Sequence, residues 1–145
     1  MHQGLRDLVN EKRNSQAMRI LIADDESLAR RLIVKMFRTD GWIVSEVSSA
    51  EQALSLWQRG QFDVVLTDYL MPGMNGIALA KRIRTDEVRQ LSARSVRLIL
   101  LSGSVHVAAF GMSLTQGLFD VVLAKPASFN VIRRAANGES SHEYR

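Results

Sequence analysis

Hydrophobic and polar residues follow one another in a pattern that predicts strands and helices in alternation. Several apolar runs rich in Val, Ile and Leu are too short for independent helices and are typical of strands buried on both faces. One further run alternates apolar and polar residues, as a half-buried strand does. We predict buried strands at 18–23, 64–66, 96–101 and 121–124, and a half-buried strand at 42–47.

The first predicted helix follows the strand at 18–23. Ser27 is its predicted N-cap, because a serine hydroxyl can accept a hydrogen bond from a free N–H of the first turn. Asp40 and Gly41 are predicted to end this helix. Its apolar residues recur at helical spacing, which predicts one face turned to the core. These residues are Leu28, Ala29, Leu32, Ile33, Met36 and Phe37.

Four more helices are predicted along the chain. One begins at Ser49, buries Trp57 and ends at Gly60, and the next has an apolar face within 77–83, followed by a charged connection at 85–94. A weak helix at 105–116 and a short one at 129–136 complete the set, the former interrupted by a glycine and by β-branched residues. This alternation predicts an α/β fold with a doubly wound parallel sheet and right-handed crossovers.

Length and composition limit the class of protein. With 145 residues and 46% hydrophobic residues, the chain can form one domain with its own core. The absence of cysteine excludes a disulfide scaffold. No apolar run approaches membrane-spanning length and no signal peptide is recognised, so we expect a cytoplasmic protein. We expect an N-terminal arm or linker at 1–17, the domain at 18–136 and a flexible tail at 137–145.

The net charge of +4 invites a nucleic-acid interpretation, but the basic residues are dispersed along the chain. No zinc finger, helix-turn-helix pair or aromatic stacking platform is recognised. Direct nucleic-acid binding is therefore not expected, and a solvated basic face that attracts an acidic protein partner is the better interpretation.

Polar residues with chemical potential stand where the predicted strands end. Asp24 and Asp25 follow the first strand, Asp68 the third, Ser102 the fourth and Lys125 the fifth. The carboxyl ends of parallel strands share one edge of a sheet, which is where such folds bind ligands. Any one of these residues alone has an ordinary interpretation, since Asp68 for example could merely cap a turn. Together they predict a cluster of three carboxylates, a hydroxyl and an ammonium.

Such a cluster favours a divalent cation. Two like charges about 4 Å apart repel by roughly 1 kcal/mol in water and roughly 4 kcal/mol near a protein surface. An all-oxygen site of carboxylates and water suits Mg²⁺. A cation together with Lys125 could neutralise an incoming phosphoryl group, with Asp68 as the nucleophile of an in-line transfer and Ser102 as a hydrogen-bond donor to the transferred group.

Four motifs give the chain a resemblance to the receiver domain of bacterial response regulators. They are ADDES after the first strand, DYLMPGMNG after the third, LSGS after the fourth and LAKP after the fifth. The resemblance covers about residues 18–136. It implies a flavodoxin-like (βα)5 three-layer sandwich with strand order 2-1-3-4-5, and a cis peptide bond before Pro126.

The resemblance also implies a metal site. By position, Asp24 and Asp25 match the acidic pair that holds Mg²⁺, with Asp25 as a direct ligand and Asp24 acting more through water. Asp68 and the backbone carbonyl of Leu70 would complete the protein's share of the coordination. Mn²⁺ is expected to substitute for Mg²⁺.

The remaining matches imply the chemistry. Asp68 matches the phosphoacceptor, Lys125 the lysine that contacts the phosphoryl group, and Ser102 the switch hydroxyl. The resemblance implies transfer from a phosphohistidine on a sensor histidine kinase or a histidine phosphotransfer protein. The domain would catalyse its own phosphorylation and dephosphorylation without turning over an independent substrate, and its conformation would then shift to control a downstream protein.

Two departures from the family pattern bear on these expectations. Val122 stands where the family often has an aromatic partner of the switch hydroxyl, and valine lacks the alternative rotamers of such a ring, so this coupling is not predicted here. The chain also ends soon after its last helix. We therefore expect a stand-alone receiver or a receiver from a larger chain such as a hybrid sensor kinase, with homodimerisation left open.

Three other interpretations compete with the receiver domain. A flavodoxin-like binding module should carry a hydroxyl- and glycine-rich phosphate loop after the first strand, where this chain has Asp24 and Asp25. A phosphatase of the haloacid dehalogenase type should carry its nucleophile in a D-x-D pattern at the end of the first strand, followed by a cap insertion. A degenerate receiver that only binds a partner is the third alternative, and the presence of all the residues expected for phosphorylation argues against it.

Overall fold

The protein forms a parallel sheet of five strands in the order β2-β1-β3-β4-β5. The structure is a computed structural model that describes residue 4 and residues 17–90, 95–103 and 117–139. Its strands are β1 (Arg19–Ala23), β2 (Ile43–Val47), β3 (Val64–Asp68), β4 (Arg97–Gly103) and β5 (Val121–Lys125). The predicted fold class and strand order are confirmed.

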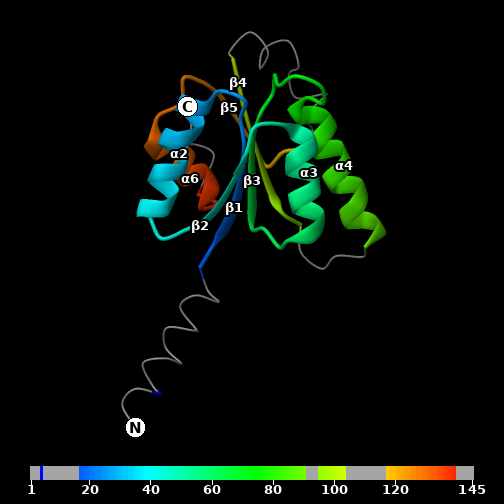
Figure 1. Cartoon of the computed structure of the whole chain (residues 1–145), viewed down its shortest axis with the longest axis horizontal. Coiled ribbons are helices and arrows are strands. Elements are labelled where there is room, and N and C mark those ends of the chain that lie inside the picture. Colours follow the sequence, from blue (N-terminus) through cyan, green and yellow to red (C-terminus); the bar gives the residue numbers. More distant parts are fainter. Residues whose placement is uncertain (1–3, 5–16, 91–94, 104–116, 140–145) are drawn as a thin grey trace.

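Helices cover both faces of this sheet (Figure 1). They are α2 (Ser27–Thr39), α3 (Ala50–Arg59), α4 (Gly76–Arg89) and α6 (Phe129–Ala136). Figure 1 shows α2 and α6 together on one face and α3 and α4 on the other, which gives three layers. The helix predicted at 105–116 lies outside the described residues, as do most of the arm at 1–17 and of the tail at 137–145.

Strand β3 lies at the centre of the sheet, paired with β1 on one side and β4 on the other. All five of its residues are buried. Alternate residues contribute to two cores, one under α2 and α6 around Leu66 and Phe37, the other under α3 and α4 around Val65 and Leu79. A strand buried on both faces holds the position of its last residue, Asp68, firmly.

The start of α2 differs from the prediction. Glu26, not Ser27, has the extended backbone of the N-cap, and no side chain caps this helix. The helix turns Ile33 and Phe37 to the sheet, with Val34 and Met36 beside them. Leu28 and Leu32 lie on the flank of this buried stripe, and their exposures are 73% and 49%. The helix predicted from their i, i+4 spacing is present, but the prediction that the two leucines face the core was wrong.

The third helix is longer than predicted. Residues 85–89, expected in a connection, are the last turn of α4, and two acidic residues of this turn, Asp86 and Glu87, are buried. Glu87 is paired on both carboxylate oxygens: Oε1 accepts a hydrogen bond from Arg84 Nη1 at 2.8 Å, and Oε2 accepts one from the backbone N–H of Val96 at 2.6 Å. A buried charge is tolerated when it is paired in this way. The charged composition therefore misled the prediction.

Replacing Glu87 with alanine is expected to destabilise the protein by about 1–3 kcal/mol, because the substitution leaves the buried Val96 N–H without its acceptor. Urea unfolding followed by circular dichroism measures this free energy. Val88→Ala, at the next and exposed position, is the matched control and should change stability little. Equal stability of the two variants would contradict the assigned role of Glu87.

Candidate functional site

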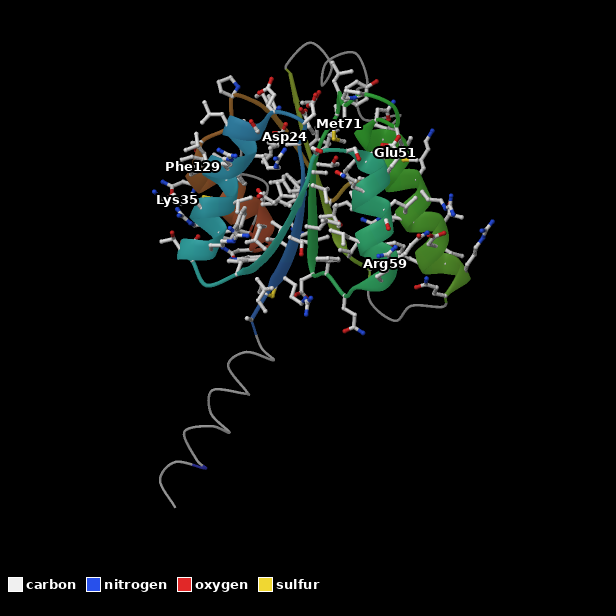
Figure 2. All side chains as sticks on the ribbon, in the orientation of Figure 1. Asp24, Lys35, Glu51, Arg59, Met71 and Phe129 are labelled. Atoms are coloured by element: carbon white, nitrogen blue, oxygen red, sulfur yellow. The ribbon has the colours of Figure 1, made fainter. Side chains whose placement is uncertain are left out.

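Three carboxylates meet at the carboxyl edge of the sheet. Asp24 and Asp25 directly follow β1, and Asp68 ends β3. One carboxylate oxygen from each lies within 4.8 Å of the others. Asp24 and Asp68 are buried and Asp25 is exposed. Figure 2 shows Asp24 at this end of the sheet, between the two helical layers.

This spacing fits a small divalent cation. Two oxygens bound to one Mg²⁺ are at most about 4.2 Å apart, twice its ligand distance of ~2.1 Å. The three carboxylate oxygens, which lie within 4.8 Å of one another, are close to that limit. Because Asp25 remains open to solvent, water can supply the other ligands that Mg²⁺ usually keeps. The donor set therefore fits Mg²⁺.

Lys125, the last residue of β5, provides the positive charge of the cluster. Its Nζ donates a hydrogen bond to Asp68 Oδ2 at 2.9 Å. The other oxygen of Asp68, Oδ1, accepts a hydrogen bond from the backbone N–H of Tyr69 at 2.8 Å. Burial works to lower the pKa of the Lys125 ammonium, but the hydrogen bond and charge of Asp68, with the charges of Asp24 and Glu26, raise it above its ordinary value. Lys125 is therefore charged at neutral pH.

Asp24 lies in a less favourable environment. Burial raises the pKa of its carboxyl above the ordinary value, against the lowering effects of a backbone hydrogen bond from Glu26 and of the charge of Lys125. The charge of Asp68 adds to the rise. A cation at this position would reverse the balance, since opposite charge favours the ionised carboxylate.

Ser102 lies on the neighbouring strand. Leu101 of β4 stands opposite Asp68 in the register, and Ser102 is the next residue toward the carboxyl edge. Ser102 is buried, and its Oγ donates a long hydrogen bond of 3.3 Å to the carbonyl of Gly103. The structure thus places this hydroxyl on the strand beside the acidic cluster, with a weak bond that a better acceptor could replace.

A tight loop connects Asp68 to α4 and carries Leu70. The N–H of Gly76 donates to the carbonyl of Tyr69 at 2.9 Å, and a Cβ at Gly76 would collide with the carbonyl oxygen of Asp68. Only glycine permits this close approach of backbone to backbone. The Leu70 side chain is exposed while that of the next residue, Met71, is buried in the core under α3 and α4.

Two other sequence expectations concern the surroundings of Lys125. The peptide bond between Lys125 and Pro126 is cis, as predicted. Val122 is partly buried on β5.

A groove of about 380 Å³ lies beside Lys125 and Asp24, between α2 and α6, with mostly apolar walls that include Leu32 and Phe129.

Sequence reasoning missed two residues that support the cluster. Arg30 Nη1 donates a hydrogen bond to the backbone carbonyl of Asp24 at 2.6 Å, and so fixes the end of β1 from α2. Glu51, in the first turn of α3, accepts a hydrogen bond from the N–H of Met74 in the loop after Asp68, at 2.8 Å. The position of Arg30, six residues after Asp24, was the only local signal. Nothing in the sequence joins Glu51 to a loop 23 residues away.

Comparison with known proteins places this geometry in a family. The sequence model of a protein family, the response regulator receiver domain, matches residues 20–137. The chain is 45% identical over 71 residues to chemotaxis protein CheY-3 of Vibrio cholerae, a match to 48% of this chain and 55% of that protein. It is 34% identical over 123 residues to the virulence sensor protein BvgS of Bordetella bronchiseptica, a match to 83% of this chain and 10% of that protein.

A solved structure agrees with these relatives. The response regulator protein TrrA from Thermotoga maritima, in complex with Mg²⁺ and BeF, superposes with a TM-score of 0.71 at 26% identity, covering 83% of this chain and 97% of that one. Among the described residues, no helix is both long enough and apolar enough to cross a bilayer. From the family match, the relatives and the shared fold, the chain belongs to the response regulator receiver domain family of two-component signalling.

Proposed function

We propose that this domain accepts a phosphoryl group from a phosphohistidine onto Asp68 in a Mg²⁺-dependent reaction, and that the modification switches its conformation to control a partner protein. One observation carries the proposal. The carboxylate of Asp68 contacts the Lys125 ammonium at 2.9 Å and lies within 4.8 Å of the carboxylates of Asp24 and Asp25. This arrangement supports the proposal, because a candidate nucleophile, a donor set that could hold a cation and a positive charge lie together.

Each residue has a defined task in this reaction. Asp68 Oδ attacks phosphorus in line, so that an O–P bond forms while the P–N bond to the histidine breaks and the imidazole leaves. Asp24, Asp25, Asp68 and the Leu70 carbonyl would hold Mg²⁺, which when bound supplies charge neutralisation for the phosphoryl oxygens. Lys125, already beside Asp68, would pair with the transferred group. Attack by water on the same acyl phosphate would later release inorganic phosphate.

The switch would follow from the new charge on Asp68. The Ser102 hydroxyl, whose present hydrogen bond is long, would turn toward the phosphoryl oxygens as a donor. We propose a sensor histidine kinase or a histidine phosphotransfer protein as the donor. In support, the receiver domain of Saccharomyces cerevisiae Ssk1, which shares this fold, has been crystallised with the histidine phosphotransfer signaling protein Ypd1. The proposed unit, residues 18–136, would act in the cytoplasm and pass its state on through protein contacts.

Incubation with acetyl phosphate tests the proposal. Intact-protein mass spectrometry should show the addition of one phosphoryl group with Mg²⁺ or Mn²⁺ present and none when EDTA removes the cation. A mass gain that persists in EDTA would contradict the role given to the acidic cluster. No gain under either condition would favour a receiver that acts only by binding a partner.

A further inference from the structure

Glu51 joins helix α3 to the loop that follows the phosphoacceptor. Its side chain starts from the first turn of α3, and Oε1 accepts a hydrogen bond from the backbone N–H of Met74 at 2.8 Å. Figure 2 shows Glu51 at the same end of the molecule as Asp24 and Met71. This hydrogen bond lowers the pKa of the Glu51 carboxyl, so the acceptor is a carboxylate at neutral pH.

The loop is shaped around this carboxylate. Gly73 has a φ of +81°, a conformation that side chains rarely adopt. A Cβ at Gly73 would lie 2.6 Å from Glu51 Oε1, closer than real Cβ atoms approach any neighbour. Glycine at this position therefore allows both the turn and the approach of Glu51. Two features of the loop therefore accommodate Glu51 Oε1: Met74 donates its N–H to this oxygen, and Gly73 has no side chain that would occupy its position.

The segment that Glu51 holds includes the residue proposed to complete the cation site. Leu70, whose carbonyl is the proposed fourth protein ligand of Mg²⁺, lies between Asp68 and Met74. Bonds to neighbouring elements fix both ends of this segment, residues 69–75. The N–H of Tyr69 donates to the backbone carbonyl of Leu101 on β4, and the side chain of Asn75 caps α4 by accepting from the N–H of Ala78 at 2.8 Å. In the described part of the chain, two side chains outside residues 69–75 accept a hydrogen bond from their backbone: Asp68, from its neighbour Tyr69, and Glu51, from Met74. Glu51 is the one that comes from another element.

We propose that Glu51 is a positioning residue for the cation site: by holding the Met74 N–H, it orders the loop that presents the Leu70 carbonyl. The inference rests on the proposed function and deepens it. Glu51 does not touch the reacting atoms. Its contribution is to reduce the number of conformations among which the carbonyl would otherwise be distributed, which makes the site better organised for a cation that demands near-ideal geometry.

Three substitutions separate this role from simple attraction of the cation by a surface charge. Glu51→Ala removes the acceptor and the charge, and should weaken Mg²⁺ binding about three- to tenfold, at or below the low end of the range for groups that orient metal ligands. Glu51→Gln keeps an acceptor oxygen at the same reach and should stay near wild type. Glu51→Asp keeps the charge but is one methylene too short, so it should behave like alanine.

Isothermal titration calorimetry with MgCl₂ and hydrogen exchange of the Met74 amide are the readouts. We expect faster exchange and weaker binding together in the alanine and aspartate variants. Glu139→Ala, at an exposed glutamate that follows α6, is the control for lost charge. Unchanged binding by Glu51→Ala, or equal weakening by Ala and Gln with Asp like wild type, would overturn the positioning role alone. Absence of Mg²⁺ binding by the wild-type protein would overturn the proposed function and this inference with it.

Discussion

Replacing Asp68 with asparagine is expected to abolish phosphorylation. The amide has nearly the shape of the carboxylate but lacks the charged oxygen that attacks phosphorus. Asp68 ends β3. Among the described contacts, it is the one carboxylate of the three in the cluster that accepts a hydrogen bond from Lys125. Intact-protein mass spectrometry after incubation with acetyl phosphate and Mg²⁺ should show no mass gain, where the wild-type protein gains one phosphoryl group.

Asp63→Asn provides a matched control for this variant. Asp63 precedes β3 at the opposite end of the sheet, where it accepts a hydrogen bond from the backbone N–H of Arg19 at 2.8 Å. The substitution makes the same chemical change five positions earlier, so it should leave phosphorylation intact. Thermal unfolding of both variants checks that they fold. Full phosphorylation of the Asp68→Asn protein would show that the phosphoacceptor is another residue.

Lys125→Ala is expected to slow phosphotransfer by about a hundred- to thousandfold, the usual effect of removing one preorganised group that stabilises transition-state charge. The same substitution should strengthen Mg²⁺ binding, because it removes a positive charge that is 2.9 Å from Asp68 and leaves the three carboxylates without their ammonium. Slower phosphotransfer together with tighter Mg²⁺ binding would therefore indicate that Lys125 acts in the transfer and competes with the cation. The rate comes from the time course of phosphorylation, and the affinity from calorimetry with MgCl₂.

Lys81→Ala, at an exposed position of α4, controls for the loss of one lysine charge and should change neither quantity. A Lys125→Ala protein phosphorylated at the wild-type rate would show that the ion pair with Asp68 serves the fold and not the transfer. Weaker Mg²⁺ binding by this variant would show that Lys125 orders the acidic cluster and does not compete with the cation.

The apolar pattern predicted the fold well because the strands are buried on both faces and leave little ambiguity. The run at 64–66 lies within β3, every residue of which is buried. The pattern failed where polar contacts, not periodicity, decide burial. Glu87 is buried through its bonds to Arg84 and Val96 N–H, and a charged segment read in isolation gives no sign of those partners.

The cluster could be predicted because parallel strands end at one edge, so residues distant in sequence are brought together by topology alone. Asp24, Asp25, Asp68 and Lys125 meet for this reason. The residues that support them could not be predicted in this way. Arg30 reaches Asp24 from a helix and Glu51 reaches Met74 from another, and such contacts depend on how helices are rotated over the sheet.

The assignment of the phosphoryl group to one residue is tested most directly by chemical trapping. The protein is phosphorylated with acetyl phosphate and Mg²⁺, the acyl phosphate is reduced with borohydride to homoserine, and tandem mass spectrometry of the peptides locates the reduced residue. We predict homoserine at position 68 alone. Homoserine at Asp24 or Asp25, or no reduced aspartate in a protein that has gained a phosphoryl group, would contradict the proposed mechanism.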